Sequence, residues 1–327
     1  MIDLLSLAVD TNAYKTILAD KESGRLSHAY LVVCSDGDNL KEYLKILAKL
    51  ITCGQSEPGK TCRDCTLIDN EAHPDVLFFP KKEGSVVVDD VNELISESHI
   101  KPIESERKVF VVCGGETMNL PSQNKLLKTL EEPPKNVHVL IGATSEYPLL
   151  QTVKSRLKRV EIPAYSPKKL YSALSLEFTD EERLKNAIAC GDGTVGKAVS
   201  LYADENLSLA VETAVDTLIN MRSSADVLDY SQKISNLKSD INEFLSVLEL
   251  LLRDVLAVLI GKEELALNSQ AKRVVSEGVN FTQGAVVYAL DKVNEAYERK
   301  KFNANPTMLL EWLLFQILEG KYKWQKS

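Results

Sequence analysis

Short apolar runs alternate with helix-length segments between residues 27 and 162. The runs are nearly continuous in Val, Ile, Leu and Phe, and they cover residues 29–33, 76–79, 109–112, 137–143 and 159–162. Strands that are buried on both faces have this composition, and their alternation with helices is typical of a parallel sheet. We therefore predict a three-layer α/β domain over residues 1–165.

After Ser166-Pro167 the pattern is helical only. It predicts a small helical domain over residues 166–205 and a larger helical domain over residues 206–327. In the small domain, Thr179 and Glu182 have the spacing of a capping box, and Gly191 is expected to end the helix that follows.

Two later segments, residues 241–260 and 306–318, are apolar on nearly every side, and Asn305 is the expected cap of the second. A helix that is apolar all round must be covered all round. The cover is either the core of a helical bundle within the chain or a subunit partner. The pattern leaves both open.

The composition, 44% hydrophobic and 26% charged in 327 residues, is that of an ordinary globular protein. The net charge of −8 excludes a strongly basic protein that binds nucleic acid through phosphate contacts alone. The amino terminus is acidic where a signal peptide is basic. The apolar tract 247–260 contains Arg253 and Asp254 and is shorter than the ~18 residues of a membrane span. We expect a cytoplasmic protein without a membrane contact.

A phosphate-binding loop of the Walker A type, Gly-x-x-x-x-Gly-Lys-Ser/Thr, would follow the first strand of a nucleotide-binding domain. Its glycines let backbone amides wrap the phosphates, its lysine reaches the outer phosphates and its hydroxyl binds Mg²⁺. The residues at these four positions are Cys34, Asn39, Leu40 and Lys41. Because Asp36 and Asp38 would also repel a triphosphate, the loop is degenerate.

The acidic site for hydrated Mg²⁺ is also missing. It would follow the apolar strand at 109–112, but that strand ends in Cys113-Gly114-Gly115, and Glu116 comes three residues late. Two independent losses at one site predict that the chain does not bind or hydrolyse a nucleotide of its own.

Three segments resemble the delta-prime family of clamp-loader subunits of bacterial DNA polymerase III. They are Ser27-His28-Ala29-Tyr30-Leu31, His73-Pro74-Asp75 and Asn124-Lys125-Leu126-Leu127-Lys128-Thr129-Leu130-Glu131-Glu132-Pro133-Pro134. The related gamma/tau subunits share much of this pattern. The resemblance covers essentially the whole chain and implies an AAA+ α/β domain, a helical lid and a helical collar that assembles with other subunits.

Glu131 and Glu132 lie in the last turn of a helix that Pro133 ends. The helix dipole disfavours negative charge there. Either the two glutamates are solvated, or one contacts a basic group on the same or a neighbouring subunit.

Residues 151–159 form a basic connection, with four basic residues among positions 154–159. Taken alone, it is typical of a solvated loop. The family places a Ser-Arg-Cys motif here, and Ser155-Arg156 matches its first two positions while Leu157 replaces the cysteine. The resemblance implies that Arg156 is an arginine finger that reaches the γ-phosphate of ATP on a neighbouring subunit, with Ser155 supporting the same motif.

Two further positions correspond to nucleotide sensors in active members of this superfamily. Thr144 follows the strand at 137–143, and Lys197 lies near the start of the lid helix. Without the phosphate loop and the acids, we interpret both as structural.

Cys53, Cys62 and Cys65 have the spacing of a metal site, whereas Cys34, Cys113 and Cys190 are read as small buried residues. The family carries a zinc module of four cysteines. In one alignment the fourth cysteine position falls at Ile68; in the other, the position without a cysteine falls at Gly59. Structural zinc takes four ligands. His73 or Asp69 could complete the set; otherwise the three cysteines are reduced thiols in a surface knob.

The resemblance implies a non-hydrolysing subunit of the polymerase holoenzyme that supports gamma/tau ATPase subunits and a delta subunit. Through the complex it would act on the sliding clamp and primed DNA during replication. The alternatives are an active ATPase of the gamma/tau type, or a zinc-dependent nucleic-acid-binding protein that acts alone.

Overall fold

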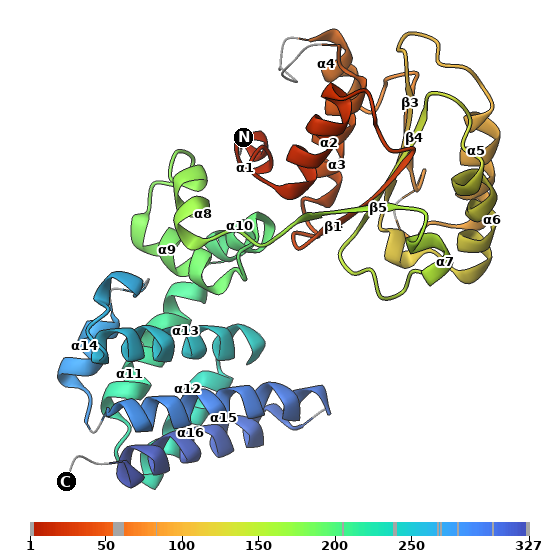
Figure 1. Cartoon of the computed structure of the whole chain (residues 1–327). Coiled ribbons are helices and arrows are strands. Elements are labelled where there is room, and N and C mark those ends of the chain that lie inside the picture. The colour runs from red at the N-terminus through yellow and green to blue at the C-terminus, as the bar shows by residue number, and fades with distance from the viewer. Residues whose placement is uncertain are drawn as a thin grey trace. The chain divides into compact units, whose positions relative to one another are not determined.

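The computed structural model describes residues 3–54, 62–82, 84–204, 206–237, 241–266, 268, 270–279, 281–302 and 304–324. The chain divides into two compact units, Met1–Lys169 and Leu170–Ser327 (Figure 1). Within the described ranges, no helix is both long enough and apolar enough to cross a bilayer.

The first unit is built on a five-stranded parallel sheet with the order β2-β3-β4-β1-β5. The strands are β1 (Ala29–Cys34), β2 (Val76–Phe79), β3 (Lys108–Cys113), β4 (Val137–Ala143) and β5 (Lys158–Ile162). All five were predicted to within one residue at each end. They formed where expected because each run is apolar enough to be buried on both faces.

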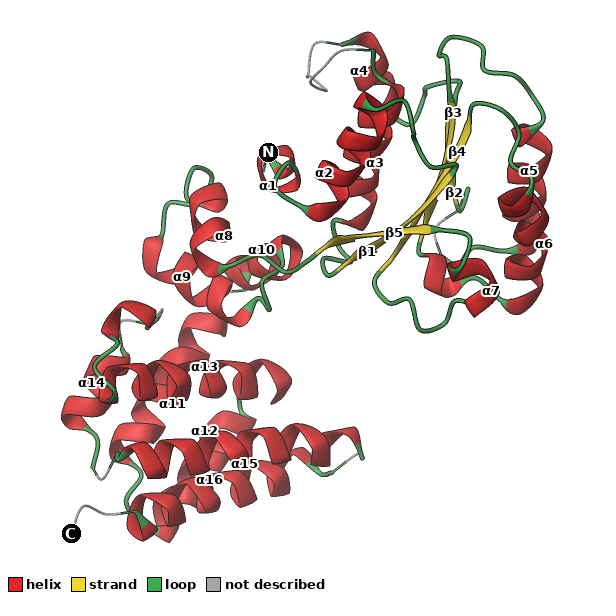
Figure 2. Ribbon diagram, in the orientation of Figure 1, coloured by secondary structure: helices red, strands yellow, loops and turns green. Residues whose placement is uncertain are grey.

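Helices cover both faces of this sheet. They are α1 (Leu4–Ala8), α2 (Asn12–Glu22), α3 (Leu40–Thr52), α4 (Arg63–Asp69), α5 (Val88–Ser98), α6 (Leu120–Glu131) and α7 (Gln151–Lys154), with a 3₁₀ turn η1 (Gly115–Thr117). Figure 2 shows α2 and α3 on one side of the sheet and α5, α6 and α7 on the other. On the second side, Leu94, Leu126 and Val153 pack against sheet residues such as Leu31 and Ile141.

The second unit is helical, as predicted. It holds most of α8 (Pro167–Leu174) together with α9 (Glu181–Cys190), α10 (Val195–Ala203), α11 (Asn206–Asn220), α12 (Ser224–Ser235), α13 (Ile241–Leu259), η2 (Glu263–Leu265), α14 (Ala271–Glu277), α15 (Gln283–Lys301) and α16 (Pro306–Lys323). The predicted fold class, a parallel α/β domain followed by helices, is confirmed.

One hydrophobic cluster runs through the second unit. Ala187 and Leu201, from the segment predicted as a separate lid, belong to the same cluster as Leu218, Leu251 and Leu314. The contacts therefore divide the chain once, after Lys169. A further boundary near residue 205 stays a prediction.

The two apolar helices α13 and α16 are covered largely by their own chain. Leu248 and Leu251 on α13, and Leu313 and Leu314 on α16, are fully buried in this cluster. The interpretation as a bundle core is therefore confirmed for these faces. On α16 a narrow stripe stays exposed, consisting of Met308, Phe315 and Tyr322 at seven-residue spacing.

The helix caps test the local predictions. Asn305 does cap α16, since its Oδ1 accepts from the amide of Met308 at 3.2 Å, and Gly191 does follow α9. The capping box at Thr179 is wrong by one residue. Asp180 is the N-cap of α9 and accepts from the amide of Arg183 at 3.0 Å. A carboxylate at this position fills the same need for an acceptor as a threonine hydroxyl.

Candidate functional site

A pocket of about 770 Å³ opens at the carboxyl ends of β1, β3 and β4 in the first unit. Its lining includes Gly37 and Lys41 of the degenerate loop, Cys113 after β3, Glu116, and Thr144 after β4. Carboxyl ends of parallel strands are where α/β sheets bind ligands. The structure thus brings together the positions at which the sequence predicts an eroded nucleotide site.

In the degenerate loop, the carboxylate of Asp36 takes up the hydrogen-bond donors of Asn39. Asp36 is 3% exposed, and its carboxylate accepts from the backbone amide of Asn39 at 3.4 Å and from the Asn39 side chain at 3.0 Å. These contacts put negative charge at the N-terminus of α3, the place where an active loop holds phosphate. The neighbouring thiol of Cys34 is buried, and burial raises its pKa to about 12.

Lys41 and Glu116 also have partners within the chain. Lys41 Nζ lies 2.7 Å from Oε1 of Glu71. Oε1 of Glu116 accepts from the hydroxyl of Thr144 at 2.6 Å and from its amide at 3.1 Å. The late acid and the sensor position therefore bind each other.

Arg156 follows α7, for which Ser155 is the C-cap. Its Nη1 donates to the carbonyl of Thr152 at 2.6 Å, and its Nη2 donates to Oε1 of Glu131 at 2.5 Å. The Arg156 side chain is 33% exposed and that of Glu131 is 48% exposed. Of the two readings of the glutamate pair, contact with a basic group of the same chain is confirmed for Glu131.

Gln123 has no role in the sequence-based prediction, yet its hydrogen bonds link α6 to the segment that leads into α7. It is 1% exposed; its side-chain amide donates to the carbonyls of Met118 at 3.0 Å and Pro148 at 3.1 Å, and its Oε1 accepts from the amide of Leu150 at 2.7 Å. Gln123 lies three residues before the buried Leu126, on the apolar face of α6. A polar residue on the apolar face of a helix is the sequence signal that could have pointed to Gln123.

The rest of the basic connection is largely neutralised. Lys158 Nζ lies 2.6 Å from Oδ2 of Asp20, and Arg159 pairs with Glu146 at 3.0 Å and Glu161 at 3.1 Å. Hydrogen bonds from these two glutamates raise the pKa of Arg159. A fully solvated basic loop is therefore not what the structure contains.

The three clustered cysteines do come together. The ligand atoms of Cys53, Cys62 and Cys65 all lie within 4.8 Å of one another, and the sulfurs of Cys53 and Cys62 are 3.6 Å apart. A backbone hydrogen bond from Cys65 lowers the pKa of Cys62, which favours the thiolate form that metals bind, whereas burial raises the pKa of Cys65 to about 12. In the described part of the chain, no histidine or carboxylate joins this group.

Neither of the proposed fourth ligands, His73 and Asp69, lies in the thiol group, and Asp69 pairs with Lys49. Of the two positions at which the fourth cysteine is missing, Ile68 is buried and apolar, and Gly59 lies outside the described residues. Nδ1 of His73 accepts from the amide of Asp75 at 3.0 Å, and its Nε2 is 3.4 Å from the hydroxyl of Ser105. The structure therefore does not bring His73 to the thiols.

The His73-Pro74-Asp75 motif instead holds the loop that precedes β3. Asp75 is fully buried, and its carboxylate accepts from the backbone amides of Ile103, Glu104 and Ser105 at 2.7 to 2.8 Å. Three charge-assisted bonds satisfy this buried carboxylate. Asp75 therefore has a structural role, which is to hold this loop in place.

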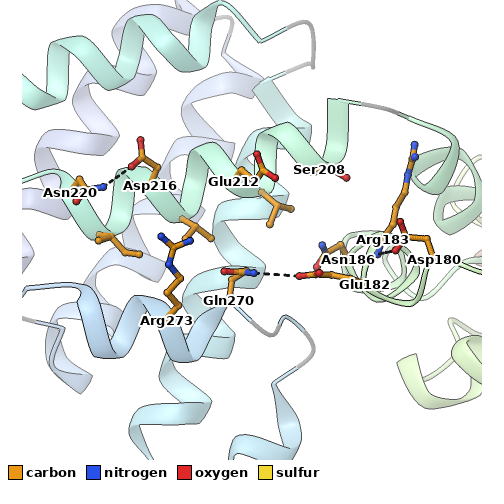
Figure 3. A pocket seen from close by; sticks show the side chains of 13 residues that line it. Asp180, Glu182, Arg183, Asn186, Ser208, Glu212, Asp216, Asn220, Gln270 and Arg273 are labelled. Carbon is orange, nitrogen blue, oxygen red and sulfur yellow. Dashed lines mark hydrogen bonds between the residues drawn. The ribbon is translucent and has the colours of Figure 1, made fainter.

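The second unit contains the second sensor position and a pocket of its own. Lys197, the second sensor position, lies on α10 and pairs with Asp192. A pocket of about 400 Å³ lies between α9, α11 and α14. Figure 3 shows Glu182, Glu212 and Arg273 among the side chains that line it. The amide of Gln270 donates to Glu182 across it, at 3.4 Å.

Comparison with known proteins gives this arrangement a context. Residues 9–166 match the family model described as DNA polymerase III, delta subunit. The delta' subunit of DNA polymerase III from Bacillus subtilis is 27% identical over 307 residues, which cover 91% of this chain and 93% of the relative. The chain is thus similar to a bacterial delta-prime subunit over nine-tenths of its length.

Three further proteins are similar to this chain. The delta' subunit of Escherichia coli is 26% identical over 199 residues, covering 59% of this chain and 60% of the relative. A gamma subunit from Buchnera aphidicola is 26% identical over 186 residues, covering 54% and 52%. Among solved structures, a gamma subunit-related protein from Thermotoga maritima is 20% identical, covers 94% of this chain and 99% of that one, and has a TM-score of 0.45.

Leu157, where the delta-prime pattern has cysteine, is accommodated without disturbing the motif. Its side chain is 8% exposed and joins the hydrophobic cluster between the sheet and α5, α6 and α7. Val153, at 0% exposure, anchors α7 in the same cluster. These two anchors hold the backbone on either side of Ser155 and Arg156.

Proposed function

We propose that this chain is a non-hydrolysing clamp-loader subunit of the delta-prime type. In this role it supplies Arg156 in trans to ATP bound by a neighbouring ATPase subunit. The observation that carries the proposal is a contrast within one domain. Its own phosphate loop is closed by Asp36, whereas the Ser155-Arg156 motif is intact and one-third exposed. A permanently charged, planar guanidinium suits the charge that develops in phosphoryl transfer.

The proposed partners are the ATPase subunits of the gamma/tau type and a delta subunit, with the sliding clamp and primed DNA reached through the complex, in the cytoplasm. The exposed stripe on α16 supports a subunit contact in the helical unit. Met308 is 71% exposed, Phe315 37% and Tyr322 53%, which is unusual for large apolar side chains aligned on one helix face.

The first prediction tests the arginine. In a clamp loader reconstituted with its motor and delta subunits, Arg156→Ala is expected to slow clamp- and DNA-stimulated ATP hydrolysis at the site it faces by on the order of 10³-fold. Single-turnover hydrolysis measures this. Lys154→Ala, which changes another basic residue of the same turn, is the matched control and should leave the rate unchanged. An unaltered rate in Arg156→Ala would remove the finger from the proposal.

An active ATPase of the gamma/tau type is the competing function. It requires a loop that binds triphosphate, and here Leu40 is 3% exposed at the lysine position while Asp36 occupies the helix N-terminus. Calorimetric titration of the chain with Mg-ATP separates the two functions. We expect no binding heat, whereas saturable binding would favour the ATPase.

The cysteine cluster leads to a second prediction. Three thiol ligands within 4.8 Å fit three of the four positions of a structural zinc site, and we propose that Cys53, Cys62 and Cys65 hold zinc there. One equivalent of zinc per chain is expected by elemental mass spectrometry. Cys65→Ser should lose it, whereas Cys190→Ser, which changes a buried cysteine in α9, should retain it. A metal-free wild-type chain purified without chelator would contradict this proposal.

A further inference from the structure

The ion pair between Glu131 and Arg156 is poorly explained by folding. Glu131 is the last residue of α6, where the helix dipole disfavours a carboxylate. Its side chain is half exposed, and ion pairs at such exposure add little to stability. A residue that is unfavourable for its helix and adds little to the fold has to be explained by what it does to its partner.

The partner is held from two directions. Nη1 of Arg156 donates to the Thr152 carbonyl of its own turn, and Nη2 donates to Glu131 from the neighbouring helix α6. Two acceptors on different elements fix the plane of a guanidinium, because its donors form a rigid fork. Among the described residues, Nε makes no hydrogen bond, so one edge of the group stays available to a third acceptor.

The support behind this contact is rigid. Gln123 and Leu126 are buried on α6, and Val153 and Leu157 are buried on either side of Arg156. Gln123 also accepts a hydrogen bond from the amide of Leu150, the N-cap of α7. The carboxylate and the guanidinium thus come from two elements that are fastened to each other, whereas Glu132, the next residue, is exposed.

We propose that Glu131 is a positioning residue for Arg156. It acts by holding the guanidinium in one orientation, so that the orientation is set before a neighbour's phosphate arrives. This inference rests on the proposed function of Arg156. A preset orientation matters for catalysis because a freely rotating arginine would have to be ordered in the transition state.

The experiment uses the full chain in the reconstituted clamp loader. Glu131→Ala is expected to lower kcat for stimulated ATP hydrolysis by about five- to tenfold with KM for ATP unchanged. Glu131→Gln keeps an acceptor oxygen and should stay within about twofold of wild type. Glu132→Ala is the matched control and should be silent. In an Arg156→Ala background, Glu131→Ala should cause no further loss, because the residue acts only through the arginine.

The outcomes separate this inference from the function on which it rests. If Arg156→Ala is impaired and Glu131→Ala equals wild type, the positioning role is wrong and the arginine finger stands. If Arg156→Ala is also without effect, the proposed function fails first. An equal loss in Glu131→Ala and Glu132→Ala, or a further loss in the double variant, would also overturn the inference. Should Glu131→Ala fold poorly, Glu131→Met takes its place with the same expected loss in kcat, because it keeps the length of the side chain and removes the acceptor oxygens.

Discussion

At the scale of single residues, buried charge is held by backbone groups in both units. Asp75 accepts three amides in the first unit. In the second unit, Lys321 is 4% exposed, and its Nζ donates to the carbonyls of Leu218 at 2.5 Å and Met221 at 3.3 Å. These carbonyls lie at the end of α11, where a helix leaves acceptors without partners and where a cation is favoured.

Lys321 makes the stability of the protein depend on pH. Burial lowers the pKa of its ammonium group from 10.5 to about 8, and the nearby Arg222 contributes to this. Between pH 8 and 10.5 the folded chain releases a proton that the unfolded chain retains, so the free energy of unfolding should rise with pH, by up to about 3 kcal/mol. Urea denaturation at several pH values measures the rise.

The matched comparison for this prediction is Lys321→Met against Lys323→Met. The first variant removes the titrating group and should lose the rise, whereas the second changes an exposed lysine and should keep it. Because both variants retain every tyrosine, the titration of the phenols cancels in the comparison. A rise that persists in Lys321→Met would assign the pH dependence to another group.

At the scale of elements, the strands and most helices could be predicted because their signal is local. The run 137–143 is apolar throughout, and it became β4 (Val137–Ala143), fully buried. The contact between Glu131 and Arg156 could only be suspected, because it depends on how two helices far apart in the sequence pack. The carboxylate of Glu131 in the last turn of α6 indicated that a basic partner was needed, but it did not indicate which residue was that partner.

The same limit explains the incomplete metal site and the misplaced cap. Spacing brings Cys53, Cys62 and Cys65 together, but it carries no information on whether His73 turns toward them or toward Ser105. That choice follows from the loop that Asp75 fastens. At α9, threonine and aspartate are both good caps one residue apart, so local preference could not separate them.

The contact of α3 with β4 gives a prediction at this scale. A Cβ at Gly142 would lie 2.5 Å from Cδ1 of Leu44 and 2.9 Å from Cδ1 of Leu40, and both leucines are buried. Gly142→Ala must therefore force the buried ends of these leucine side chains aside, which should lower the free energy of unfolding by roughly 1–3 kcal/mol. Denaturant titration followed by circular dichroism measures it. Gly54→Ala, with nothing within 4 Å of its added Cβ, should be nearly neutral.

At the scale of the whole molecule, the net charge of −8 and the basic connection fit together. Arg156, Lys158 and Arg159 each pair with a carboxylate of the first unit. The connection therefore carries little unpaired charge for holding a nucleic acid by phosphate contacts. This pairing agrees with the proposal that Arg156 meets a protein partner and not a nucleic acid.

The two units each have a hydrophobic cluster, and this leads to the last prediction. Both tryptophans of the chain, Trp312 and Trp324, lie in the second unit, so their fluorescence reports the unfolding of that unit alone. Circular dichroism reports both units. Because separate cores lose their packing separately, Gly142→Ala should shift the dichroism transition to lower denaturant and leave the fluorescence midpoint in place. A fluorescence midpoint that moves together with the dichroism would mean that the two units unfold as one.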